Sequence, residues 1–315
     1  MILRWDDKYL QFERIEWSGT DTQASRQVTF TLPSNPYDPS FEKVKIKLGD
    51  IVQLYENKKR VFIGVVTSRE KTAEAGTASF TARDFMHYLL RSNATHKFKG
   101  MTAEAITKKV CKEVGVSTKS LPKTKVKIKK LYFQDQPIYD IIIKAFRKAR
   151  VKTGRKYMPV MDGKSLTVIT KGKSCGVCLE QSEDIISATY SDTTDNMVNL
   201  VKIYNDKLKM LGKVQNKSSI KKYGIYQANY TKEKDVKAKP VAKSMLVGIT
   251  REASVEAIGN IKCIAGKSIQ IHDKATGLSG WFYITADTHV FENGVHTMQL
   301  ELSWKNSMEE GAETV

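Results

Sequence analysis

The sequence predicts a mainly β protein with an α+β middle domain, and three observations support this fold class. Apolar and polar residues alternate in segments near both ends of the chain, as in 51–55 and 295–302, which is the period of a half-buried strand. Segments with helical spacing of apolar residues lie between them, at 102–115 and 137–154. The 315 residues, 41% of them hydrophobic, suffice for two or three domains with cores.

Two stretches of about forty residues repeat one order of strands and turns. One begins at Leu48 and the other at Ala265. Each has a glycine, an alternating strand, a polar turn, a second strand, a polar loop that ends in glycine (Gly76 and Gly294), and a third strand. Chance similarity between two antiparallel hairpins is the alternative explanation.

An earlier pair of segments also matches. The stretch from Ile15 and the stretch from Ala188 each contain an aromatic-Ser strand end, a Thr/Asp-rich turn and an alternating strand. The ordered match of both blocks favours two β-domains related by internal duplication. The predicted domains are 1–93 (first β-domain), 94–178 (α+β middle domain) and 179–315 (second β-domain, with a helical, Lys-rich insertion near 207–250).

The middle domain has clear helix signals. Thr102 is suited to an N-cap before a helix that ends near Gly115, and Pro137 is suited to the first turn of a helix that stops near Gly154. Two short strands are expected on either side of Gly163. Within the insertion, 239–251 resembles a helix and 207–224 a lysine-rich loop or short helix.

The segment HVFENGVHTM places two histidines around a tight turn. A two-residue Asn293-Gly294 turn competes with a three-residue loop, 292–294. We favour the longer loop because it gathers the apolar side chains of both strands on one face. His289 and His296 then point to opposite sides, which favours a plain hairpin over a metal site. The Asp287/His289 and Asp84/His87 spacings are interpreted as ordinary surface pairs.

The four cysteines are too scattered for a disulfide framework and are expected to be reduced. Cys175 and Cys178 have the spacing of redox and zinc motifs. They follow a predicted strand and not a helix N-terminus, and Cys111 and Cys263 are solitary in sequence. We therefore expect no metal, no cofactor and, since no catalytic motif is present, no enzyme activity.

Positive charge is concentrated in the middle of the chain. Lys and Arg number 52 against 34 Asp and Glu, for a net charge of +18. The run 119–133 alternates lysines with Thr124, Val126 and Ile128, so a strand there would carry a lysine face. This face could contact an acidic protein or phosphates, and the alternative is a solvated edge strand. Aromatic residues are absent from the run until Tyr132 and Phe133, which weakens the case for a single-stranded nucleic-acid platform. The predicted electrostatic partner surface consists of Lys123, Lys125, Lys127, Lys129 and Lys130.

The N-terminus MILRWDDKYLQF carries early charges and lacks the features of a secretory signal. The chain has no uninterrupted apolar run of spanning length. We expect a protein made in the cytoplasm and not inserted in a membrane.

The order of these parts resembles the baseplate hub proteins of PBSX-like contractile tails, the XkdQ/YqbQ family of prophages and phage-tail-like bacteriocins. The resemblance rests on the N-terminal β-domain, the helices TAEAITKKVCKEVGV and QPIYDIIIKAFRKA, and the closing stretch from AGKSIQIHD to MQLELS. It implies a tail-tube-like β-barrel in each β-domain and a structural homotrimer that joins a six-fold tail tube to a three-fold spike.

The partners implied by this resemblance are the tail tube protein, the spike protein and other baseplate proteins. The tape-measure protein is a further partner that the resemblance suggests. The implied location is the host cytoplasm during assembly and then the tail or bacteriocin particle. Two alternatives remain open on the residues alone: a basic nucleic-acid-binding protein and a cell-wall-binding adaptor.

Overall fold

The computed structural model describes residues 1–22, 25–35, 37, 44–71, 76–234 and 236–308. The chain divides into a larger unit, 1–188 with 254–315, and a smaller unit, 189–253. The smaller unit contains the insertion predicted near 207–250. Among the described residues, no helix is both long and apolar enough to cross a membrane.

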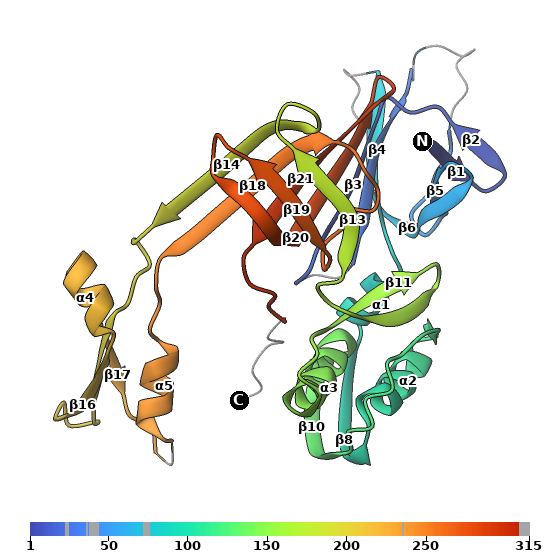
Figure 1. Ribbon diagram of the computed structural model, residues 1–315. Coiled ribbons are helices and arrows are strands. Elements are labelled where there is room, and N and C mark those ends of the chain that lie inside the picture. Colours follow the sequence, from blue (N-terminus) through green and yellow to red (C-terminus); the bar gives the residue numbers. More distant parts are fainter. Residues whose placement is uncertain (23–24, 36, 38–43, 72–75, 235, 309–315) are drawn as a thin grey trace. The chain divides into compact units, whose positions relative to one another are not determined.

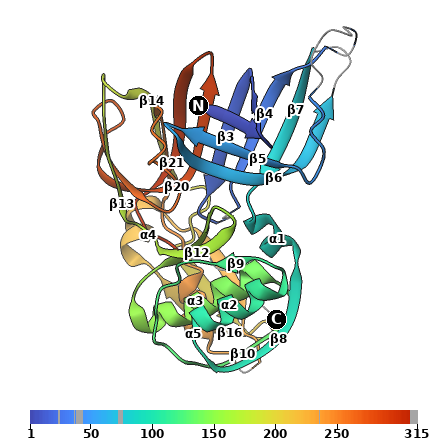
Figure 2. The same cartoon turned by 90° about the vertical axis from the view of Figure 1, so that its right-hand side faces the viewer.

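A 13-stranded sheet dominates the chain (Figures 1 and 2). Its strands follow the order β14-β18-β21-β20-β3-β4-β7-β6-β5-β1-β2, with β19 beside β20 and β13 beside β19. Their bounds are β1 Ile2–Trp5, β2 Lys8–Leu10, β3 Arg14–Thr20, β4 Gln27–Pro33, β5 Ile51–Glu56, β6 Lys59–Lys71, β7 Thr77–Arg83, β13 Ser174–Glu180, β14 Ile185–Thr193, β18 Thr250–Ile258, β19 Ser268–Asp273, β20 Leu278–Glu292 and β21 Val295–Ser303.

This strand path is open at both ends, so the described residues form no closed barrel, and the expectation of two barrels within one chain is wrong. The reason lies in the pairing of β3 with β20, from Arg14↔Glu292 to Thr20↔Ala286. This pairing joins the two β-regions edge to edge, so that neither region closes on itself.

The two β-regions have the same strand order. The first follows β3-β4-β7-β6-β5-β1 and the second β14-β18-β21-β20-β19-β13. The last strands differ in direction, because β1 is antiparallel to β5 and β13 is parallel to β19. The entry into each repeated hairpin is also alike. The backbone N–H of Gly49 donates to Val66 O at 2.9 Å, and that of Gly266 donates to Ile284 O at 2.9 Å. Both glycines have positive φ, 91° and 87°, a conformation that disfavours a side chain.

The two regions also share a β-bulge. Strand β6 changes partner from β5 to β7 at Val65, and β20 changes from β19 to β21 at Tyr283. In each strand a threonine, Thr67 or Thr285, lies in the bulge two residues later. The hydroxyl of Thr67 donates to Thr81 O at 3.3 Å, and that of Thr285 donates to Glu301 O at 3.2 Å.

The earlier sequence match was correct for only one of its two strands. The segment after Ala188 forms β14, in the place of β3. The next alternating segment forms β15 (Leu200–Tyr204), which pairs with β16 (Met210–Gln215) and β17 (Gln227–Thr231) in a separate sheet. The counterpart of β4 is β18. The smaller unit occupies the β14–β18 connection, where the first region has only residues 21–26 between β3 and β4.

The β20–β21 hairpin has the two-residue turn and not the predicted three-residue loop. Glu292 pairs with Val295, and Asn293 and Gly294 both have positive φ, 51° and 78°, as a type I′ turn requires. The bulge at Thr285 explains the error, because it shifts the side-chain alternation by one residue. Apolar residues before the bulge therefore share the buried face with Phe291, Met298 and Leu300.

The middle of the chain packs two helices against small sheets around its own apolar cluster. Thr102 caps the first helix as predicted, its Oγ1 accepting from Ala105 N at 3.4 Å, and the second helix follows Pro137 and ends at Gly154. Two strands form on either side of Gly163, also as predicted. The elements are α1 Met86–Arg91, β8 Asn93–Met101, α2 Ala103–Glu113, β9 Ser117–Thr118, β10 Ile128–Pro137, α3 Ile138–Thr153, β11 Tyr157–Asp162 and β12 Ser165–Thr170.

The smaller unit has a small core of Val201, Ile203 and Ala242. The helix predicted over 239–251 is confirmed only in its first part, as α5 (Ala238–Ser244), because Thr250 begins β18. The lysine-rich segment 207–224 contains β16 and the short helix α4 (Lys217–Tyr223).

Candidate partner surface and buried polar groups

The predicted lysine segment is exposed, but most of it is not a strand. Lysine side chains from 123 to 130 are exposed, while Thr124 and Ile128 are buried. The strand β10 starts only at Ile128, and Lys125 has a φ of 56°, outside the extended region. The exposure therefore alternates as expected although the backbone is irregular.

Strand β8 brings two more lysines to this segment. Lys99 is opposite Lys130, and Lys97 is opposite Tyr132. The Nζ atoms of Lys130 and Lys97 lie 4.3 Å and 5.3 Å from the Tyr132 ring centroid, and Tyr132 is 47% exposed. Phe133, by contrast, is buried. We call these residues the basic surface: Lys97, Lys99, Lys123, Lys125, Lys127, Lys129, Lys130 and Tyr132.

Lysine ammonium groups around an aromatic face can bind carboxylates or phosphates, with the ring orienting the cations. Sequence reasoning missed Lys97 and Lys99 because they precede the lysine run by twenty residues or more. The signal that could have found them is the alternation of Lys97, Phe98 and Lys99 in a predicted strand.

A buried polar cluster lies where β3 meets β20, contrary to the expectation that Asp287 and His289 form a surface pair. Asp287 and His289 are 1% and 0% exposed. Arg26 Nη1 donates to Asp287 Oδ1 at 2.9 Å, and its Nη2 donates to Oδ2. The Arg26 guanidinium also stacks 4.2 Å over the Trp17 ring. The Asp287 carboxylate and both Nη atoms of Arg26 are hydrogen-bonded, which offsets the cost of their burial, whereas Arg26 Nε and Trp17 Nε1 are buried without a hydrogen-bond partner among the described residues.

The two histidines face each other, so the expectation that they point to opposite sides is wrong. His289 Nε2 lies 3.1 Å from Cys263 O and therefore carries the proton, which leaves Nδ1 to accept from His296 Nε2 at 3.0 Å. Burial lowers the pKa of both His289 and His296 to about 4. Both rings are neutral near pH 7, as this hydrogen bond requires.

Asp84 is buried as well, which corrects its interpretation as a surface residue. Its carboxylate accepts from Ser25 Oγ at 3.0 Å, from Arg26 N at 3.1 Å and from Met86 N at 3.1 Å. Burial raises the pKa of Asp84 to about 7 in spite of these bonds. Burial also disfavours the charged form of His87 and therefore lowers the pKa of its imidazole.

The cysteines of the C-x-x-C segment do not act as a pair. All four cysteines are free. Cys175 is buried, and its Sγ lies 3.9 Å from that of Cys263, so Cys263 is not solitary in space. Cys178 is exposed in the same strand and lies near Glu180 and His272.

Solved phage tail proteins and a secretion component share the fold of this chain. The 43 kDa tail protein of prophage MuSo2 from Shewanella oneidensis aligns with a TM-score of 0.72 at 14% identity, over 96% of this chain and 97% of that one. The E. coli c3393 protein, a type VI secretion component described as similar to T4 tail proteins gp27 and gp5, aligns with a TM-score of 0.56 at 8% identity, over 99% and 79%.

Sequence comparison identifies the family. The YQBQ-like family model matches residues 15–303, and the chain therefore belongs to the YQBQ-like family. The phage-like element PBSX protein XkdQ of Bacillus subtilis is 26% identical over 319 aligned positions, which cover 97% of each protein.

Proposed function

We propose that the chain is the structural hub of a contractile-tail baseplate and has no catalytic activity. Three copies would form a ring between a six-fold tail tube and a three-fold spike. Membership of the YQBQ-like family and similarity to a protein of the phage-like element PBSX support this role. The type VI component described as similar to phage tail proteins has the same fold, which is consistent with it.

Internal duplication is the basis of this proposal. The shared strand order, the matching glycine hydrogen bonds and the matching threonine bulges support descent of both β-regions from one ancestor. Independent hairpins would have no reason to place a hydroxyl–carbonyl bond at the same bulge. We retain 1–93, 94–178 and 179–315 as the proposed domains, with the ring built from the first and third.

One observation supports the proposed ring most directly. Within the chain, β3 of the first region pairs with the C-terminal half of β20 of the second. The equivalent strands are β14 and the C-terminal part of β6. Strand β14 is the last strand at one end of the strand path, so its outer edge has no strand beside it among the described residues. In the described part of β6 after Val65, the only strand partner is β7, on one side. Pairing β14 of one copy with β6 of the next would repeat the β3–β20 joint between chains.

Such pairing closes a ring of three copies with six similar β-regions, in which joints within and between chains alternate. It also covers strand edges that would otherwise pair with unrelated chains. In the match between the two regions, Asp192 corresponds to Gly19 and Arg69 corresponds to Asp287. Gly19 is opposite Asp287 within the chain. The same pairing between chains therefore places Asp192 of one copy opposite Arg69 of the next. Opposite charges at this position favour the pairing.

A cross-link tests the joint. Thr193 and Ser68 occupy the positions equivalent to Thr20 and Ala286, which pair within the chain. The test variant carries Thr193→Cys and Ser68→Cys. In assembled particles that carry both changes and Cys178→Ser, a short thiol-reactive cross-linker should produce covalent trimers. Ser187→Cys with Ser68→Cys is the register control, since position 187 lies about 20 Å further along β14. Absence of the trimer from intact particles would refute the joint.

The basic surface supports a second candidate function, binding of nucleic acid. Its lysines and exposed Tyr132 match what a phosphate backbone and a stacked base require. We favour an acidic tail or spike protein as its partner, because the surface carries only one exposed aromatic ring. A gel shift with DNA that weakens steeply with salt would support the nucleic-acid alternative.

A further inference from the structure

Four polar side chains form a small square on one face of the parallel strands β13 and β19. The register sets Cys178 opposite Gln270 and Glu180 opposite His272. Side chains alternate along a strand, so these four share one face. The residues between them, Leu179 and Ile271, are buried on the other face.

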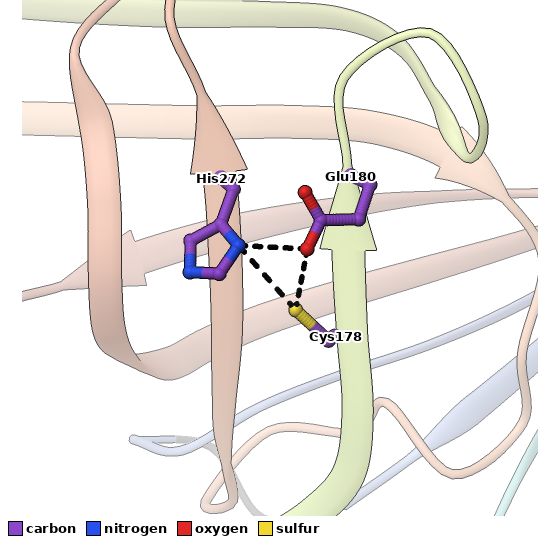
Figure 3. A group of neighbouring side chains, drawn as sticks. All are labelled: Cys178, Glu180 and His272. Carbon is purple, nitrogen blue, oxygen red and sulfur yellow. Dashed lines mark hydrogen bonds and ion pairs between the residues drawn. The ribbon is translucent and has the colours of Figure 1, made fainter.

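Three of these side chains aim their polar atoms at one point (Figure 3). His272 Nδ1 lies 2.7 Å from Glu180 Oε1. Cys178 Sγ lies 3.3 Å from the same oxygen and 3.9 Å from His272 Nδ1. The three atoms are all within 4.8 Å of one another, and no other such group occurs among the described residues.

We propose that Cys178, Glu180 and His272 bind a zinc ion. Thiolate, imidazole and carboxylate together are a typical zinc donor set. Calcium and magnesium use oxygen ligands almost exclusively, so the sulfur and nitrogen exclude them here. Three protein ligands leave a fourth position for water or for a group from a neighbouring protein.

The measured separations suit a tetrahedral ion. Bonds of about 2.0 Å to nitrogen and oxygen and about 2.3 Å to sulfur give ligand–ligand distances of about 3.3 to 3.5 Å. The two distances from Cys178 Sγ, 3.3 Å and 3.9 Å, are already close to this range. Only the hydrogen-bonded Glu180–His272 pair must widen, and both side chains are partly exposed, at 43% and 40%.

Gln270 can orient the histidine in either state. Without metal, His272 Nδ1–H donates to Glu180, and Nε2, 3.1 Å from Gln270 Nε2, accepts from that amide. With metal on Nδ1 the proton moves to Nε2, and the amide turns so that its oxygen accepts. Gln270 can therefore hydrogen-bond His272 Nε2 with or without the metal.

Zinc binds cysteine as the thiolate, so loading of the site releases the Cys178 proton. Bound zinc would fasten the edge strand β13 to β19.

Cobalt titration of the full chain tests the site. After chelator treatment under reducing conditions, the chain should take up one Co²⁺ and show thiolate-to-cobalt charge-transfer absorption, which zinc then removes. Cys178→Ser should abolish this absorption, and His272→Gln or Glu180→Gln should weaken cobalt binding by about tenfold or more. Zinc should raise the melting temperature of the wild-type chain but not that of Cys178→Ser.

Two controls separate this site from other thiols and ion pairs. Cys175→Ser removes the buried thiol of the same strand and should leave the absorption intact. His96→Gln breaks a histidine–glutamate pair with a 2.8 Å contact and no nearby thiol, and it should also leave the absorption intact. The proposal is overturned if the wild-type chain shows no such absorption, or if Cys178→Ser retains it.

Discussion

Arg26 and Asp287 form a bidentate ion pair that joins the first β-region to the second. Arg26 Nη1 lies 2.9 Å from Asp287 Oδ1, and the Asp287 side chain is fully buried. Ala265 N donates to the same oxygen at 2.6 Å. The joint between β3 and β20 is therefore fixed by side chains as well as by the strand ladder.

Removal of one partner from this pair should be costly. We expect Asp287→Asn to lower the free energy of unfolding by about 3–5 kcal/mol, because it leaves a largely buried guanidinium without a counter-charge. Urea denaturation measures the change. Glu292→Gln is the matched control, since it breaks the exposed Arg14–Glu292 pair between β3 and β20 and should cost less than about 1 kcal/mol. Equal losses in both variants would contradict a special role for Asp287.

The two threonine bulges should be energetically equivalent. Thr67→Val and Thr285→Val each remove one hydroxyl–carbonyl bond, so each should cost about 0.5–1.5 kcal/mol. Thermal or urea unfolding of both variants tests this expectation. A large loss for one threonine and none for the other would argue against equivalent bulges.

Stability should fall on mild acidification because of His289. Its pKa is about 4 when folded and ordinarily about 6.5, so the unfolded chain binds the proton first as the pH drops. The contribution of His289 is complete above about pH 6.5 and is lost down to about pH 4, with a slope of up to about 1.4 kcal/mol per pH unit. His296, whose pKa is also lowered to about 4, acts in the same direction, and Asp84, whose pKa is raised to about 7, acts in the opposite direction, so the net effect of acidification is still a loss of stability. The pH dependence of unfolding should therefore be shallower in His289→Gln than in the wild-type chain, and an unchanged slope would refute the assignment.

The basic surface should act through charge. Changing Lys125, Lys127 and Lys129 to Gln should weaken binding of an acidic tail or spike partner, more at low salt than at high salt, since exposed charges are screened within about 8 Å at physiological ionic strength. Folding stability should change by less than about 0.5 kcal/mol per substitution. Salt-dependent binding measurements are the test, and normal binding at low salt would leave these lysines as a solvated surface.

Local signals in the sequence predicted local structure well. The Thr102 cap and the helical spacing that follows it specify α2, because both depend on residues a few positions apart. The glycine-marked repeat predicted the order of β5, β6 and β7 and of β19, β20 and β21. The hairpin loop was wrong because the bulge at Thr285 has no signature in side-chain alternation, and the alternation then appeared to need a longer turn.

The sequence alone did not predict which distant strands pair with each other. Cys178 and His272 are 94 residues apart and meet only because β13 pairs with β19 in parallel register. The burial of Asp287 depends on Arg26, 261 residues away. Such contacts follow from strand order, which periodicity alone does not specify.

Counting copies in the particle tests the hub proposal most directly. Images of purified tail or bacteriocin particles with this protein labelled should show three copies per baseplate, with the two β-regions of each copy alternating around one ring between tube and spike. Six copies per baseplate, or a ring in which only one β-region of each chain takes part, would contradict the proposal.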